Sequence, residues 1–90
     1  MLTIPMETMA VISTGHLSYM ERRDLQAQII EKRVTGMFRE EGFLVYVDQI
    51  PPLSSQLAFI LGFMKAHEVV WVLFDCDGEQ VAELPYYHEE

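Results

Sequence analysis

Two short runs of this sequence are apolar at every position, and they limit the possible folds more than any other feature. Residues 43–47, FLVYV, and residues 69–74, VVWVLF, are rich in the aromatic and β-branched side chains that favour strands. A strand that is apolar on both sides is normally covered on both faces of its sheet. The rest of the chain, or a second chain, must therefore supply cover for two faces.

Two helices are predicted outside these runs. The first follows a capping box, in which Ser18 is the N-cap and Glu21 is the third helical residue, and it extends to about Val34. The second extends over about residues 56–68 after a serine cap. Apolar side chains cover more than half of the circumference of this second helix, which predicts contacts on two of its sides.

Two more strands complete the predicted order. Residues 8–13 form a short first strand, and residues 80–87 form a last strand after Asp77-Gly78, a pair typical of hairpin turns. Pro85 either places that last strand at an edge of the sheet or shortens it. The order β-α-β-α-β-β predicts an α+β fold, with two helices against a small mixed β-sheet, in a single domain over residues 1–90.

This layout leaves apolar surface to be covered. Either the two helices divide between the faces of the sheet, or another chain covers one face. A large exposed apolar patch promotes association, so we expect a homodimer with a symmetric interface. Aromatic and methionine side chains are enriched at interfaces, and the residues expected there are Phe59, Phe63, Met64 and Tyr86.

Charge is distributed unevenly along the chain. There are 14 acidic and 6 basic residues, a net charge of −8, and from Glu40 onward Lys65 is the only base. This balance argues against direct binding to nucleic-acid phosphates or to anionic membranes. It suits a basic surface on a partner protein, such as one that holds nucleic acid. The expected contact residues surround the last hairpin: Asp75, Asp77, Glu79 and Glu83. The alternative is an acidic protein whose charges only face solvent.

The sequence also bears on the compartment. Cys76 is the only cysteine, which excludes a disulfide within the chain and a cysteine-based zinc site within it. The first residues lack the basic start and apolar stretch of a signal peptide. No apolar stretch reaches the ~18 residues of a membrane span. We therefore expect a cytoplasmic protein.

The strongest catalytic pattern is VLFDCDG at residues 72–78. It resembles the first motif of the haloacid dehalogenase phosphatases, and this resemblance implies Asp75 as nucleophile, Asp77 as general acid/base and a magnesium ion between them. That family also needs a later Ser or Thr and a Lys, and none follows Gly78. The histidines also lack the spacing of metal ligands: His16, His67 and His88. We therefore expect no catalytic residue, no metal ligand and no cofactor, and the chain is predicted not to be an enzyme.

Two short motifs carry a second resemblance. ISTGHL at residues 12–17, and DCDG at residues 75–78 followed by Leu84-Pro85, resemble the start and the end of a family of small uncharacterised proteins. That family is carried on bacterial plasmids, prophages and genomic islands. The resemblance implies an accessory gene of a mobile element, a setting in which small acidic proteins often bind host proteins. Anti-CRISPR and anti-restriction proteins are examples.

Three functional hypotheses follow. The first is a non-enzymatic, acidic, protein-binding protein that inhibits a nucleic-acid-binding host defence protein. The second is a small magnesium-dependent, phosphatase-like enzyme that uses Asp75 and Asp77. The third is a structural dimer that serves as a subunit of a larger assembly.

Overall fold

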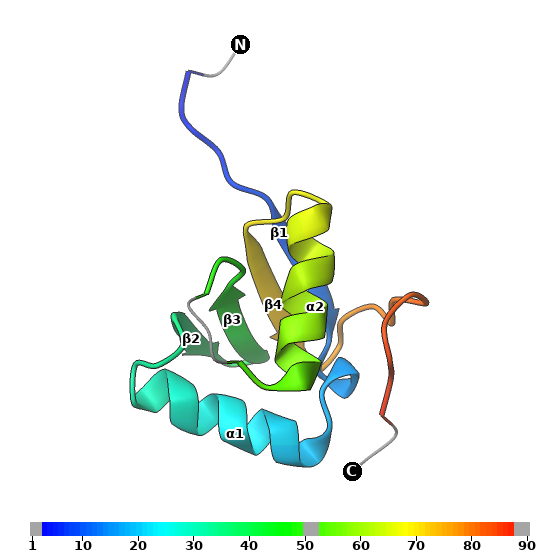
Figure 1. Cartoon of the computed structure of the whole chain (residues 1–90). Helices are drawn as coiled ribbons and strands as arrows, with labels where there is room; N and C mark the ends of the chain where they lie inside the picture. Colours follow the sequence, from blue (N-terminus) through cyan, green and yellow to red (C-terminus); the bar gives the residue numbers. More distant parts are fainter. Residues whose placement is uncertain (1–2, 50–52, 88–90) are drawn as a thin grey trace.

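The computed structural model describes residues 3–49 and 53–87, and it contains two helices on a four-stranded mixed sheet (Figure 1). The predicted α+β class is confirmed. The elements in chain order are β1 (Met9–Ser13), the 3-10 helix η1 (Thr14–His16), α1 (Tyr19–Ile30), β2 (Gly36–Arg39), β3 (Gly42–Tyr46), α2 (Ser55–Ala66) and β4 (Trp71–Asp75). No helix in the described part of the chain is long and apolar enough to cross a membrane.

The two apolar runs form the central strands of the sheet. The strand order is β1-β4-β3-β2, in which β1 is parallel to β4 and the other two pairings are antiparallel. Strands β3 and β4 therefore have a neighbour on each side, whereas β1 and β2 lie at the edges. A strand in the centre of a sheet is shielded along its length, which agrees with the lack of polar residues in both runs.

Both helices cover the same face of the sheet. Cross-strand partners share a face, and the partners Ile12, Phe74 and Phe43 all belong to one buried core. That core also contains the inward side chains of α1 and α2: Leu25, Ile29, Leu57, Ile60, Leu61 and Met64. Figure 1 shows α2 in front of the sheet and α1 running across its lower end. The helices do not divide between the two faces.

Serine side chains begin both helices, as predicted. The Ser18 hydroxyl accepts a hydrogen bond from the Glu21 amide at 3.2 Å, and the Ser54 hydroxyl accepts one from the Leu57 amide at 3.1 Å. Gln56, rather than Glu21, completes the first cap, because its Oε1 accepts from the Ser18 amide at 3.0 Å. The side-chain amide of Gln56 therefore ties the start of α1 to the start of α2.

Helix α1 ends earlier than the sequence pattern predicts. Its last residue is Ile30 rather than Val34. Lys32 has a φ of 62°, a left-handed conformation that cannot continue a helix, and the amides of Arg33 and Val34 both donate to the Gln28 carbonyl. Val34 is still buried in the core, although it lies in the turn after α1 and not in the helix.

The predicted last strand is absent, and β2 takes its place as the fourth strand. Residues 80–87 contain no strand, and the segment after β4 makes one isolated bridge, between Glu79 and Ile12. The physical reason is that β4 already has β1 and β3 on its two sides, so no edge is free for a hairpin partner. The observed hairpin instead joins β2 and β3, with Arg39 opposite Gly42.

Residues 79–87, here named the C-terminal strap, fold back over the start of the chain. His16 is 1% exposed and holds the strap with both ring nitrogens: Nδ1 lies 2.7 Å from the Pro85 carbonyl, and Nε2 accepts from the Val81 amide at 2.9 Å. The Tyr87 amide donates to the Gly15 carbonyl at 2.7 Å. A Cβ atom at Gly15 would lie 2.5 Å from the Tyr86 ring, so a larger residue here would displace that ring.

Candidate functional site

The sheet face opposite the helices, here named the open face, is apolar and has no helix over it. The register aligns one residue from each strand in a row across this face: Val11, Leu73, Leu44 and Met37. Leu73 in the centre is only 5% exposed yet lies outside the main core, whereas Met37 at the edge is 53% exposed. The row is therefore a continuous apolar strip that reaches solvent at both of its ends.

An aromatic pair extends this strip. Trp71 and Tyr46 are cross-strand partners next to the first row, and their ring centroids lie 4.9 Å apart. The Trp71 indole N–H donates to Glu7 Oε1 at 2.9 Å, so its polar atom is satisfied within the chain. Met9 is the partner of Trp71 on the other side and is exposed. The open face thus holds large side chains in fixed positions, without a charged group among these seven residues.

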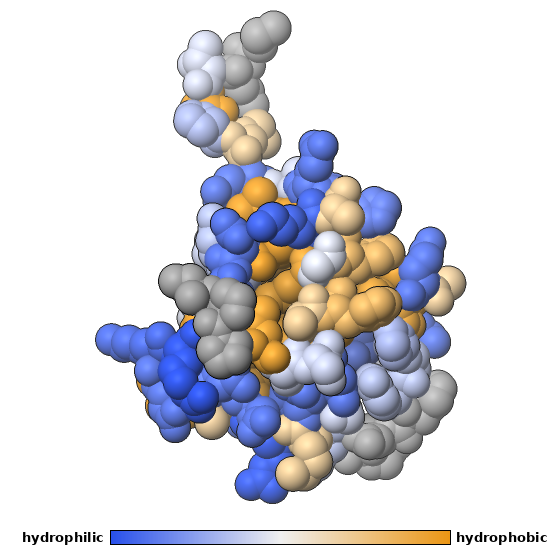
Figure 2. Space-filling view, in the orientation of Figure 1, coloured by the Kyte–Doolittle hydropathy of each residue, from blue (hydrophilic) through white to orange (hydrophobic). Residues whose placement is uncertain are grey.

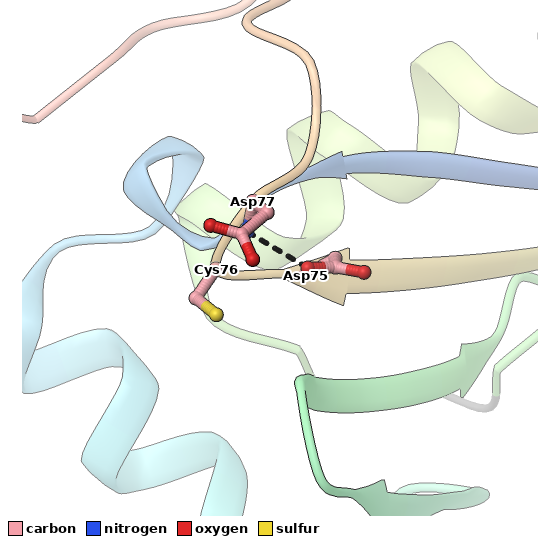
Figure 3. Close-up of side chains that lie close together, drawn as sticks. All are labelled: Asp75, Cys76 and Asp77. Carbon is pink, nitrogen blue, oxygen red and sulfur yellow. Dashed lines mark hydrogen bonds between the residues drawn. The ribbon is translucent and has the colours of Figure 1, made fainter.

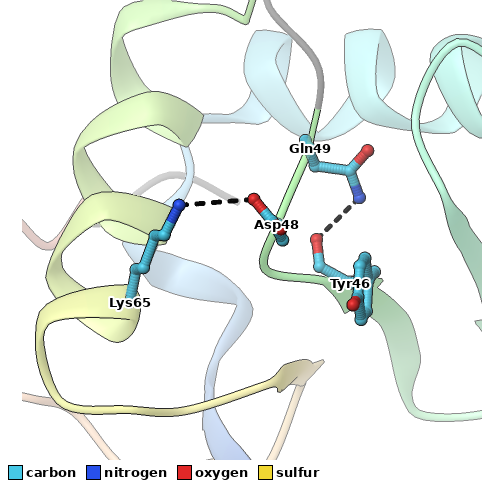
Figure 4. A network of polar contacts seen from close by, with 4 residues as sticks. All are labelled: Tyr46, Asp48, Gln49 and Lys65. Carbon is cyan, nitrogen blue, oxygen red and sulfur yellow. Dashed lines mark hydrogen bonds and ion pairs between the residues drawn. The ribbon is translucent and has the colours of Figure 1, made fainter.

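Polar contacts from Gln49 extend the β2–β3 pairing at one end of this face. The Gln49 side chain donates to the carbonyls of Tyr46 and Thr35, at 2.6 and 2.9 Å, and accepts from the Thr35 amide at 3.0 Å. Next to it, Lys65 of α2 pairs with Asp48 at 3.4 Å (Figure 4). Both partners of this ion pair are largely exposed, so it contributes little to stability.

Acidic residues gather at the opposite end of the sheet. Asp75 at the end of β4 is the register partner of Gly42, and the Cys76 amide donates to the Glu41 carbonyl at 2.9 Å. The β2–β3 turn therefore lies beside the end of β4. We name this region the acidic edge, and its residues are Glu40, Glu41, Asp75, Asp77 and Glu79.

The acidic edge contains three of the four acids that the sequence singled out. Glu83 is exposed farther along the strap, and no described contact joins it to the others. Sequence reasoning missed Glu40 and Glu41, which the register alone brings next to Asp75. Arg39 is the basic residue nearest in sequence, and it pairs with Glu41 at 3.6 Å.

The ligand atoms of Asp75, Cys76 and Asp77 lie within 4.8 Å of one another. Figure 3 shows the three side chains at the end of β4. Asp75 Oδ1 accepts from the Asp77 amide at 2.8 Å, which is the usual role of an aspartate that stabilises a turn. Cys76 and Asp77 are exposed. Lys65 lies beside the beginning of β4, next to Val69 and Val70, whereas the trio lies at its end, so this lysine takes no part in the trio. A local turn therefore accounts for this trio.

The four residues predicted at an oligomer interface do not all share one surface. Phe59 is 55% exposed on the outer side of α2, and Phe63 is half-buried with its ring 4.6 Å from that of His67. Met64 is 3% exposed, because it continues the inward stripe of α2 into the core, so it is not available at any interface. Tyr86 belongs to the strap, where its ring packs edge-on against His16 at 5.4 Å.

The histidines have structural positions where they are described. His16 uses both nitrogens to hold the strap, and His67 is the C-cap of α2. His88 lies outside the described residues. A pocket of about 180 Å³ separates α2 from the strap, with His16 and Phe59 in its wall. Gln56, another wall residue, is bonded to Ser18, so the pocket presents few free polar groups.

Comparison with known proteins assigns a family but no activity. A family model described as the C-terminal domain of a family of unknown function, DUF5983, matches residues 9–89. The chain belongs to the DUF5983 family. No curated protein and no solved structure matches the chain. The match includes β1, both helices and the strap, so the open face and the acidic edge lie within the DUF5983 domain.

Proposed function

We propose that this DUF5983 domain is a non-enzymatic protein-binding module, and that the open face together with the acidic edge forms its binding surface. The observation that carries the proposal is the apolar row from Val11 to Met37, which no helix covers and whose two end residues are exposed. Uncovered apolar surface of this kind marks interaction sites.

The chemistry of the surface specifies the kind of partner. Trp71, Tyr46 and the methionines are side-chain types that provide most of the binding energy at interfaces. The acidic edge lies at the end of the open face away from this aromatic pair, and it attracts a basic surface, which accelerates encounter. The partner is therefore a protein with an apolar patch bordered by Lys and Arg.

A protein that normally holds nucleic acid fits this description, because its groove is rich in basic side chains. With a net charge of −8 the chain competes for such a groove rather than binding nucleic acid itself. We propose that the target is a host defence protein and that the chain, encoded by a mobile element, inhibits it in the manner of anti-CRISPR or anti-restriction proteins. The site of action is the cytoplasm, where the exposed thiol of Cys76 stays reduced.

Comparative capture from a bacterial lysate tests the proposal. Four immobilised proteins are compared by quantitative mass spectrometry at low and high salt: wild type, Met37→Glu on the open face, the pair Asp77→Lys and Glu79→Lys on the acidic edge, and Phe59→Glu on α2. The expected result is a basic protein that wild type and Phe59→Glu retain at low salt, and that the other two variants lose.

The captured protein is then purified and titrated against the same four proteins. Equal affinity for wild type and for Met37→Glu would overturn the proposed surface. Absence of any protein with the expected retention pattern would also overturn it.

A further inference from the structure

A second apolar surface lies on the outer side of α2, on the face of the molecule that Figure 2 shows. Phe59 and Phe63 lie four residues apart, as do Gly62 and Ala66, so all four lie on one side of the helix and form a single stripe. Phe59, Gly62 and Ala66 are exposed and Phe63 is half-buried. A Cβ atom at Gly62 would have nothing within 4 Å, so the centre of the stripe faces open space.

We propose that a second copy of this chain docks on this stripe, with the two α2 helices antiparallel. The stripe alternates two large and two small side chains, and an antiparallel arrangement lets it complement itself. When Phe63 of one copy lies against Gly62 of the other, Phe59 necessarily lies against Ala66, because each step along one helix is a step back along the other. A twofold axis then repeats both contacts, as a symmetric interface requires.

Charge favours a second copy here and disfavours it on the open face. The chain has 14 acidic residues, but residues 55–66 contain none, and Lys65 is their only charged residue. Two copies that meet through α2 therefore bring no α2 carboxylates together. Two copies that meet through the open face would instead place both acidic edges at the border of the contact, where carboxylates that come close to one another oppose binding.

The size of the stripe sets the strength of the contact. A helix of 12 residues is about 18 Å long and about 10 Å wide. One such face buries much less than the ~800 Å² per partner of a standard stable interface. The dimer is therefore weak and dissociates on dilution, within the concentration range that analytical ultracentrifugation covers.

Sedimentation of two complementary variants tests this pairing. Gly62→Leu places a side chain where Phe63 of the second copy must lie, and Phe63→Ala removes the large side chain. Each variant alone should dissociate at least tenfold more readily than wild type.

In a 1:1 mixture, the leucine that Gly62→Leu adds meets the space that Phe63→Ala leaves at one contact, and the native pair remains at the other. The mixture should therefore recover dimer. Gln26→Leu, which adds an exposed leucine to α1, is the control and should sediment as wild type does.

The outcomes are decisive in both directions. The Gly62→Leu side chain has free space in the monomer, and circular dichroism of both variants shows whether they are folded. Recovery of dimer in the mixture but not in either variant alone supports the antiparallel α2 contact. A wild-type chain that stays monomeric up to millimolar concentration overturns it, as does a mixture that sediments as the sum of its separate components.

Discussion

The open face and the outer side of α2 are both apolar, yet their neighbourhoods differ. The open face adjoins five carboxylates at the acidic edge, whereas residues 55–66 contain none. The shapes differ as well, because the open face presents a fixed aromatic pair, and α2 alternates phenylalanines with glycine and alanine. Hydrophobicity alone predicts that both surfaces bind something. Charge and side-chain size indicate which occupant suits each one.

The largest effect is expected from a change that releases the C-terminal strap from the body of the fold. His16→Ala leaves the Val81 amide and the Pro85 carbonyl without their partner and opens a cavity beside β1. We expect the free energy of unfolding to fall by about 3 kcal/mol, as measured by urea denaturation. A loss of under about 1 kcal/mol would mean that the strap does not stabilise the fold.

The next prediction separates the two faces of the sheet. Val45 is fully buried on the helical face, and Met37 lies on the open face of the neighbouring strand. Val45→Ala should cost about 2 kcal/mol of stability, and Met37→Ala less than about 0.5 kcal/mol. The measurement is thermal or urea unfolding at low protein concentration. Equal losses would show that the open face is part of a core.

Charge reversal should distinguish the two occupants. With Asp77→Lys and Glu79→Lys together, the association rate with the captured basic partner should fall by about tenfold or more at low salt, because steering is lost. Self-association should not weaken. Stopped-flow or surface-based kinetics give the rate, and the effect should shrink as salt is added. An unchanged rate would remove the acidic edge from the binding surface.

The smallest effect concerns the phosphatase-like alternative. If the trio of Asp75, Cys76 and Asp77 is only a turn, millimolar magnesium should leave the melting temperature unchanged within about 1 °C, since a ligand that does not bind the folded state cannot stabilise it. A generic phosphate ester should not be hydrolysed. A magnesium-dependent rise in melting temperature that Asp75→Asn abolishes would revive the enzymatic hypothesis.

The sequence identifies those helices and strands that depend only on residues close together in the chain. Residues 43–47 and 69–74 could be recognised as central strands because they lack polar residues, and Ser18 could be recognised as a cap because its hydroxyl acts on the next turn. Strand β2 could not be recognised, because its four residues, GMFR, depend on pairing with β3. The segment at 80–87 has the composition of a strand but finds no free edge beside β4.

The candidate site likewise contains some residues that the sequence identifies and others that only the folded sheet brings together. Asp75 and Asp77 are two residues apart in sequence and were predicted as contact residues, whereas Glu40 and Glu41 join them only through the sheet register. The sequence indicated that some apolar surface lacks cover. It could not indicate which face, because that depends on both helices packing on the same side of the sheet.

The central claim is that the two apolar surfaces serve different occupants, and sedimentation equilibrium of two matched variants tests it most directly. Met37 and Phe59 are 53% and 55% exposed, so Met37→Glu and Phe59→Glu place the same charge at equally accessible sites. We predict that Phe59→Glu is monomeric and that Met37→Glu dimerises as wild type does. The reverse pattern, with dimer lost on the open face and retained on α2, would contradict the account.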